Sequence, residues 1–450
     1  MMNETVSIKP VPNYLSLVAR NHARILNHRA LIGRKTAIGR LIGVVESGFY
    51  PVDAVKQANS ILAQLQSGKT GVPQALDNIY ALNKLSRVKL SRARFDGYLG
   101  MLVGAGHIEF HPTDFCDHEC VGCYYKDRGN DVMPFEYFRK ILSIYNPRSV
   151  VLVGGGEPTL YKYKDKGFAD IVSEIKKYDP GIQIGVVTKG THIPGGDWQR
   201  HIDWIRVSID SSTPETFFMS KKRDAFHKVL DNYFAYLQGP IPHVGLGYLL
   251  WSRNIHETHG LVELVYNIAR KKYPSLMEKM NIQFRPMRPG VDVPEKIRKN
   301  HVSQDMICTK EQVKEAVSYF DRCLEDDTGL SKFILNNTNW EKVSEGNDFR
   351  AGKPFDKCYY CMSFKIFRPT GEVYPCFVRV SDPEYLLGNF TDPSGDELLK
   401  INLLPFLFFN KLREFCSEDK CRMAWLNNIA EDGMKNGKSC AGDAAKSYFF

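Results

Sequence analysis

HPTDFCDHECVGCYYKD, residues 111 to 127, holds three cysteines with the spacing C-x3-C-x2-C. Three thiolates on one short loop can bind three irons of a cubane iron-sulfur cluster and leave the fourth iron open to another ligand. The alternatives are a zinc site or three core cysteines, but tetrahedral zinc needs a fourth ligand and usually takes cysteines from two separated pairs. The candidate catalytic and cluster-binding residues are Cys116, Cys120 and Cys123.

A strand-then-helix pattern repeats from about residue 106 onward. Apolar runs rich in β-branched residues predict strands, and amphipathic stretches such as 135–145 and 258–272 predict the helices between them. Six such units indicate an α/β fold, a partial (β/α)6 barrel of parallel strands with helices outside and ligands at the C-terminal strand ends. The strands are expected at about 107–113, 149–154, 182–188, 204–210, 243–250 and 281–286.

The second expected strand, within SVVLVGGGEPTL at residues 149–160, stops at three glycines and an acid. With the cysteine loop, this stretch resembles the radical SAM superfamily over roughly residues 106–290. The resemblance implies an oxidoreductase or maturase that cleaves S-adenosylmethionine (SAM) reductively at a 4Fe-4S cluster. The resulting 5'-deoxyadenosyl radical would abstract hydrogen from an unactivated carbon. The motif implied to hold the SAM amino group is Gly155, Gly156, Glu157 and Pro158.

The same resemblance implies further cofactor contacts. The family usually has an aromatic residue before the third cysteine, whereas this chain has Gly122, so the adenine contact moves to Tyr124 or Tyr125. Lys189 replaces the asparagine of the usual TNG motif on the third strand. Each remaining residue also has the alternative role of a strand-end cap or turn former. These remaining expected contacts are Thr188, Ser208, Asp210 and Asn254.

The alternation of side chains along three strands predicts what the barrel interior contains. One face of each strand is apolar and the other is polar. Because helices coat the outside, the polar face should point inward, where a packed barrel would carry Val, Ile and Leu. A polar substrate is therefore expected, with a self-satisfied buried network as the alternative. The candidate substrate-binding residues are His107, Glu109, His111, Arg206, Gln283 and Arg285.

A second set of cysteines follows the barrel. Residues 364–377 have a hairpin pattern that turns at Thr370 and Gly371. The spacing Cys361-x9-Gly371-x4-Cys376 resembles the opening of the SPASM or twitch extension of radical SAM enzymes, of whose later cysteines only C-x4-C is present. The resemblance implies one auxiliary 4Fe-4S cluster, with an all-thiolate zinc site as the alternative. The candidate ligands are Cys358, Cys361, Cys376 and either Cys416 or Cys421.

The chain divides into four predicted segments: a basic, all-helical module at 1–98, the barrel at 99–300, a linker helix and strand at 301–345, and a small Cys-rich β-hairpin/helix cluster domain at 346–450. The net charge of +9 lies entirely in the first 100 residues, which hold 14 Lys and Arg against 5 Asp and Glu. These basic residues could bind an acidic partner, or they could form a helical face exposed to solvent. Cys308 and Cys323 stand apart from the clusters and are expected in the core.

The composition indicates the cellular compartment in which the protein is expected. The 43% hydrophobic and 25% charged content is that of a soluble protein, and no apolar run approaches the roughly 20 residues of a membrane span. The first 20 residues lack a signal-peptide pattern, so we expect a cytoplasmic protein without a membrane partner. Eleven cysteines in a reducing compartment favour metal or cluster ligation over disulfides.

The substrate stays open between classes. Resemblance favours a ribosomally made peptide that is crosslinked, oxidised or epimerised, with the basic helices binding an acidic leader. The alternative is dehydrogenation, dehydration or epimerisation of a polar small molecule, such as an amino sugar or nucleotide in natural-product biosynthesis, held by Arg206, Arg285 and Arg288. A nucleic-acid-modifying enzyme is a third reading, disfavoured because few aromatics interleave the basic residues. An electron donor such as flavodoxin or ferredoxin is implied.

Overall fold

The computed structural model describes residues 107–123, 125, 129–145, 147–287, 304–325, 328–340, 364–377, 380–381 and 385–391. The predicted N-terminal module and its basic charge lie outside the described residues. So do six of the residues named above: Tyr124, Arg288, Cys358, Cys361, Cys416 and Cys421.

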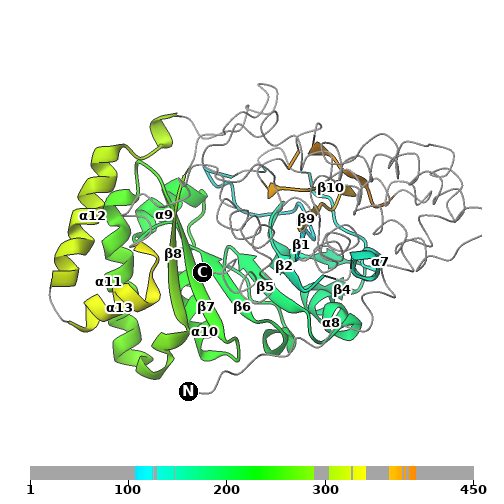
Figure 1. The fold of residues 1–450 in the computed structure, drawn as a ribbon, viewed down its shortest axis with the longest axis horizontal. Coiled ribbons are helices and arrows are strands. Elements are labelled where there is room, and N and C mark those ends of the chain that lie inside the picture. The colour runs from blue at the N-terminus through cyan, green and yellow to red at the C-terminus, as the bar shows by residue number, and fades with distance from the viewer. Residues whose placement is uncertain are drawn as a thin grey trace, which may run out of the picture.

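The described strands form one large mixed sheet in the order β11-β10-β9-β1-β2-β5-β6-β7-β8 (Figure 1). Strands β1, β2, β5, β6, β7 and β8 are parallel neighbours, and each lies at a position that the sequence predicts. This α/β arrangement with a parallel sheet is consistent with a radical SAM partial barrel. The bounds are β1 His107–Phe110, β2 Ser149–Leu152, β5 Gln183–Thr188, β6 Trp204–Ser208, β7 His243–Leu250 and β8 Met280–Pro286.

Amphipathic helices cover one face of this sheet. In α7, Phe138, Ile141, Leu142 and Tyr145 recur at helical spacing and are fully buried, as the sequence predicts. Helix α11 has the predicted bounds, 258–272. The helices between the parallel strands are α7 Glu136–Tyr145, α8 Phe168–Tyr178, α9 Pro214–Lys221, α10 Phe226–Gln238 and α11 Thr258–Lys272, and a small hairpin consists of β3 Lys162–Tyr163 and β4 Lys166–Gly167.

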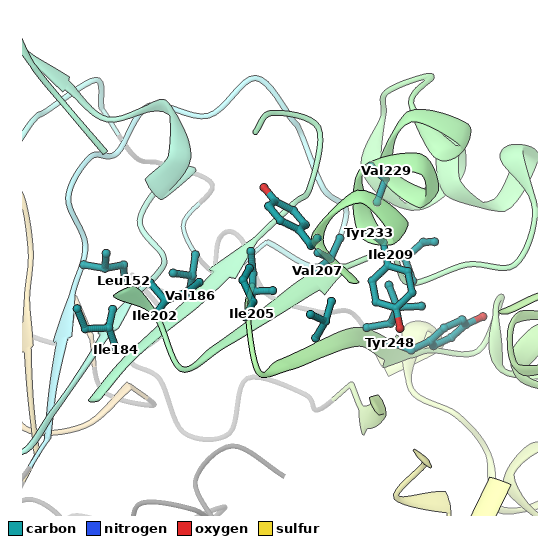
Figure 2. Close-up of a cluster of buried hydrophobic side chains, with 14 of the residues drawn as sticks. Leu152, Ile184, Val186, Ile202, Ile205, Val207, Ile209, Val229, Tyr233 and Tyr248 are labelled. Atoms are coloured by element: carbon teal, nitrogen blue, oxygen red, sulfur yellow. The ribbon is translucent and has the colours of Figure 1, made fainter. Parts of the chain in front are cut away.

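The apolar face of the strands packs against these helices. Ile205 and Val207 of β6 lie near Val229 and Tyr233 of α10 (Figure 2), and all four belong to one core cluster. Each fully buried Val, Leu or Ile contributes roughly 1.5–3 kcal/mol. Since alternate residues of a strand point to opposite faces, the polar set on β1, β6 and β8 points away from this core, as the sequence predicts.

The segment after the barrel protects the β8 edge. Helix α12, Lys310–Glu325, lies within the segment where the sequence predicts a linker helix, and α13, Gly329–Asn337, follows it. Asn339 then imitates a neighbouring strand: its Oδ1 accepts from Phe284 N at 2.7 Å, and its Nδ2 donates to Phe284 O at 2.9 Å. This pairing uses the free backbone groups of an edge strand. Cys308 and Cys323 pack against the core, which confirms that prediction.

The opposite edge is extended by the C-terminal hairpin. Strands β9, Phe364–Phe367, and β10, Glu372–Tyr374, are antiparallel and turn at the predicted glycine, Gly371, whose φ is +97°. Strand β9 also pairs in parallel with β1, and β11, Gly388–Asn389, pairs with β10. The hairpin is therefore continuous with the barrel sheet, a pairing that the sequence pattern did not indicate.

Short 3-10 turns complete the described chain. They are η2 Pro158–Leu160, η3 Trp198–His201, η4 Ile255–Glu257, η5 Pro274–Lys279 and η7 Gln304–Met306. Among the described residues no helix is long and apolar enough to cross a membrane.

Candidate active site

The cysteine loop, residues 111–123, leaves the C-terminal end of β1 and is fixed by its backbone. The amide of His111 donates to Phe367 O in β9 at 2.9 Å, and the amide of Val121 donates to Ser220 O in α9 at 2.9 Å. The loop is thus tied to the C-terminal hairpin on one side and to the barrel helices on the other.

The three predicted cysteines form no disulfide among the described residues and are partly accessible. Cys123 N donates to Cys120 O at 3.1 Å, a turn that brings these two residues together. Burial raises the pKa of the Cys120 thiol to about 11, an effect that Lys221 opposes and the neighbouring thiols reinforce. Iron bound to the sulfur would displace this proton.

The arrangement of the thiols distinguishes between the metals. Within the part of the chain that the structure describes, no three His, Cys, Asp or Glu side chains converge as ligands of a single metal ion. A tetrahedral zinc site requires such convergence. In a cubane cluster each thiolate binds a different iron, so the thiolates stay apart. Three thiols on one loop are the donor set that a 4Fe-4S cluster with one open iron takes.

The GGEP loop packs directly on the cysteine loop. The amide of Gly156 donates to Thr113 O, and that of Glu157 donates to Phe115 O, both at 2.8 Å. A Cβ on Gly156 would lie 2.0 Å from Phe115 O, and Gly155 has a φ of +68°. Only glycine fits this approach, so the two sequence motifs form one site for a physical reason.

Glu157 is buried beneath this contact, and its carboxylate is held by four donors. Its Oε1 accepts from Thr159 N, Thr159 Oγ1 and Thr188 Oγ1, while Oε2 accepts from Lys189 N at 2.8 Å. Burial raises the pKa of Glu157, and these hydrogen bonds oppose the rise. Oε2 keeps a lone pair for one more donor, such as an ammonium group. Pro158 begins the 3-10 turn that follows.

The strand ends opposite carry the other predicted contacts. Asp210, in the left-handed region at φ +54°, accepts from Leu249 N at 2.6 Å and forms an ion pair with Lys221. Asn254 is fully buried, with its amide bound to Asp210 O, Leu249 O and Trp251 N, so it holds the loop after β7 in place. Ser208 ends β6 and is half-buried.

Two buried lysines beside the cysteines extend the site beyond the predicted residues. Lys189 forms an ion pair with Asp117, and burial lowers the pKa of Lys189 to about 8 while Cys116 opposes the shift. Burial also disfavours the charge of Lys221, but Asp210 and Cys120 outweigh it and raise the pKa of Lys221. Lys189 was noticeable as a departure from TNG, whereas no sequence signal marked Lys221.

The predicted interior residues of β1 form hydrogen-bonded pairs. His107 Nδ1 lies 2.7 Å from Ser149 Oγ, and His111 Nε2 lies 2.9 Å from Glu109 Oε1. Burial lowers the pKa of His107 to about 3, so this imidazole is neutral at pH 7. These pairs bond one nitrogen of each imidazole, but His111 Nδ1 is buried without a hydrogen-bond partner among the described residues, so the network on the β1 side is only partly satisfied.

The interior residues of β6 and β8 differ. Arg206 Nη1 donates to Gln283 Oε1 at 2.6 Å. The side chain of Arg285, in contrast, makes no hydrogen bond within the described residues, and its Nε is buried without a partner. Burial and the neighbouring charge of Arg206 lower the pKa of Arg285 to about 9, which still leaves it cationic at pH 7. The network alternative does not account for Arg285.

The C-terminal hairpin contacts the cysteine loop through a buried ion pair. Arg368 Nη2 donates to Asp114 Oδ2 at 3.0 Å, and the Arg368 guanidinium lies 5.4 Å from the centre of the Tyr125 ring. Burial raises the pKa of Asp114, which Arg368 opposes. Cys376 lies just beyond β10 on the same hairpin, whose buried apolar residues pack with Tyr125. The hairpin that bears Cys376 is thus in contact with the cysteine loop.

Comparison with known proteins agrees with this geometry. Residues 110–265 match the profile of the radical SAM superfamily. The matched segment contains both the cysteine loop and the GGEP loop. No curated protein sequence matches the chain.

Several solved structures are similar at low sequence identity. Streptococcus suis SuiB bound to precursor peptide SuiA is 11% identical, with 79% of this chain and 78% of that chain covered and a TM-score of 0.48. The protein anSMEcpe with bound AdoMet is 16% identical, with 74% and 98% covered and a TM-score of 0.48. BtrN in complex with AdoMet and 2-DOIA is 12% identical, with 71% and 92% covered and a TM-score of 0.32.

Proposed function

We propose that the chain is a radical SAM enzyme that abstracts hydrogen from an unactivated carbon of its substrate. One observation carries the proposal: the cysteine loop and the GGEP loop meet through Gly156, with the Glu157 carboxylate fixed beneath the contact. A cluster ligand set and an acceptor for an ammonium group are thereby brought to the same strand ends.

When bound, the 4Fe-4S cluster and SAM supply a 5'-deoxyadenosyl radical by reductive cleavage of a carbon-sulfur bond. Cys116, Cys120 and Cys123 hold the cluster, and Glu157 accepts from the SAM ammonium. Lys221, buried next to Cys120 and Asp210, places positive charge beside an anionic cluster. The task of the protein is then to orient the substrate hydrogen and to exclude water.

The experiment is anaerobic reconstitution with iron and sulfide. Cluster content and cleavage of SAM to 5'-deoxyadenosine are measured in wild type and in a variant with Cys116, Cys120 and Cys123 changed to Ala. We expect cleavage in wild type and none in the variant. A reconstituted wild type that binds no iron, or that binds it and never cleaves SAM, contradicts the proposal.

The proposed substrate is a ribosomally made peptide, and an auxiliary 4Fe-4S cluster takes part in its maturation. The support is the SPASM-like spacing around Cys376, together with the hairpin that turns at Gly371 and packs against the cysteine loop. Wild type should then bind about eight irons and the triple cysteine variant about four. Stoichiometric zinc in place of the remaining iron would exclude the auxiliary cluster. A flavodoxin or ferredoxin is the proposed electron donor, in the cytoplasm.

A polar small molecule is the second candidate, favoured by the unpaired Arg285 in the barrel interior. Deletion of residues 1–95 separates the two candidates. Loss of peptide turnover with retained SAM cleavage supports binding of a leader peptide by the basic segment. The affinity of the full chain for the peptide should then weaken as salt screens the charges. Full turnover by the truncated chain supports the small molecule.

A further inference from the structure

The interior faces of β6 and β8 carry arginines on either side of a strand that has glycines, Gly245 and Gly247, at the facing positions. Strand β7 lies between them (Figure 1), and its register pairs Arg206 with Gly245 and Gln283 with Gly247. A Cβ on Gly247 would lie 3.1 Å from Arg285 Nη2 and 3.3 Å from Arg206 Cδ. The glycine thus leaves the space in which the two arginine side chains approach each other.

Arg285 lies beside the like charge of Arg206, so a counter-charge on Arg285 would stabilise it. The acidic group that acts on Arg285 is Asp210, but the two carboxylate oxygens of Asp210 are already bound to Lys221 and to Leu249 N. Arg285 itself has no hydrogen-bonded partner among the described residues. A guanidinium group offers five N–H donors in a fixed fork that matches a carboxylate or phosphate. A buried cation without a partner is unfavourable, so a ligand that supplies the negative charge stabilises the site.

We propose that Arg206 and Arg285, above the glycine floor of β7, form an anion site that binds a carboxylate or phosphate group of the substrate. This inference rests on the proposed function, because it names the class of molecule that the radical SAM site acts on. Gln283 orients Arg206 through its hydrogen bond, and Arg285 contributes the unpaired donors. The anion would fix the substrate relative to the strand ends where hydrogen is removed.

The carboxylate of SAM is the competing source of the same chemistry, and its anchor point argues against it. Glu157, the expected acceptor for the SAM amine, is bonded to Thr188 Oγ1 and Lys189 N at the end of β5. Gly247 lies on β7, two strands away and therefore about 10 Å across the sheet. The amine and carboxylate of methionine share one carbon, so both groups lie near β5. Lys189 and Lys221 are buried cations beside the cysteine loop.

The test is a thermal titration of the reconstituted, SAM-loaded protein with inorganic phosphate and, separately, with acetate, at ionic strength held constant with chloride. We expect one of the two anions to raise the Tm of wild type saturably. Arg285→Met should raise the half-saturating concentration at least tenfold. Gly247→Ala should do so by less, because its methyl group fills the cradle and leaves the charge. Arg270→Met, which removes an exposed arginine on α11, should respond like wild type.

Two results would overturn the anion site. The first is a wild-type Tm that neither anion raises. The second is an Arg285→Met variant whose Kd for SAM rises by the same factor as its half-saturating anion concentration. That result would mean that Arg285 binds SAM. If Arg285→Met fails to fold, Gly247→Ala carries the test, and an unchanged anion response in it counts against the site. A larger response to acetate assigns the anion to a carboxylate, and one to phosphate assigns it to a phosphorylated substrate. A wild type that binds anions without cleaving SAM refutes the proposed function and leaves this site standing.

Discussion

Glu157 and Arg285 lie on two sides of the barrel interior and differ in how completely their side chains are hydrogen-bonded. On the β2 and β5 side, Glu157 is held by four donors and every contact is made by the protein itself. On the β6 and β8 side, the half-buried Arg285 side chain makes no hydrogen bond among the described residues, and its Nε is buried. Hydrogen bonds within the protein hold the Glu157 carboxylate in position before any ligand binds, as a preorganised site requires. The unused donors of Arg285 are instead available to hydrogen-bond a ligand.

The largest expected effect comes from Gly156→Ala on the bonded side. The added Cβ would meet Phe115 O and the backbone of Asp114, none of which is a flexible side chain. The cysteine and GGEP loops must then separate, and we expect SAM binding to be lost beyond detection in equilibrium dialysis. Gly195→Ala is the matched control, because a Cβ there meets nothing within 4 Å. Equal SAM affinity in both variants would show that the two loops need not touch.

The second effect concerns the ion pair that fastens the hairpin to the cysteine loop. Arg368→Met leaves the Asp114 carboxylate buried and unpaired, a change that costs about 3–5 kcal/mol when charged groups are enclosed. The Tm should fall accordingly. Arg139→Met is the control, since its pair with Glu174 is similarly close, at 2.8 Å, but Arg139 is 59% exposed, and such pairs contribute about 0–1 kcal/mol. Similar Tm losses in the two variants would contradict the buried role of Arg368.

A smaller effect is expected from Glu157→Gln. The amide cannot accept at the position where Oε2 now accepts from Lys189 N, and the charge that would bind the SAM ammonium is gone. Losing one charge-assisted hydrogen bond of about 1.5–3 kcal/mol raises the Kd for SAM roughly tenfold to a hundredfold. Isothermal titration checks this, with iron content as the control for an intact cluster. An unchanged Kd would mean that Glu157 holds only the loop.

The same contrast explains what could be predicted from the sequence. The strand positions and helices α7 and α11 followed from local periodicity. The pairing of β9 with β1 could not be foreseen, because strand order at a sheet edge depends on contacts about 250 residues apart, such as Lys140 Nζ to Phe390 O. Lys221 lies in a charged run, and only the fold brings it to Cys120.

The predicted polar interior contains both hydrogen-bonded pairs and a side chain without a hydrogen bond. Alternation identified the inward face, but not whether the groups on it bond to each other. His111, directly after β1, is hydrogen-bonded to Glu109 of β1, and Arg206 is hydrogen-bonded to Gln283 across β7. Both pairs depend on side-chain rotamers and strand register. Only the structure separates the bonded residues from Arg285.

The smallest expected effect is a pH dependence of the folding stability that arises at His107 of β1. Burial lowers its pKa to about 3 from the usual 6.5, so between these values the unfolded chain binds a proton that the folded protein does not. Stability should therefore be complete above pH 6.5 and decline as the pH falls, by at most about 1.4 kcal/mol per pH unit. His107→Gln removes this proton, so the Tm of the variant should fall less steeply than that of wild type between pH 6.5 and 5. Parallel Tm curves would mean that His107 is protonated in the folded protein and that the β1 side, like the β8 side, holds a buried charge.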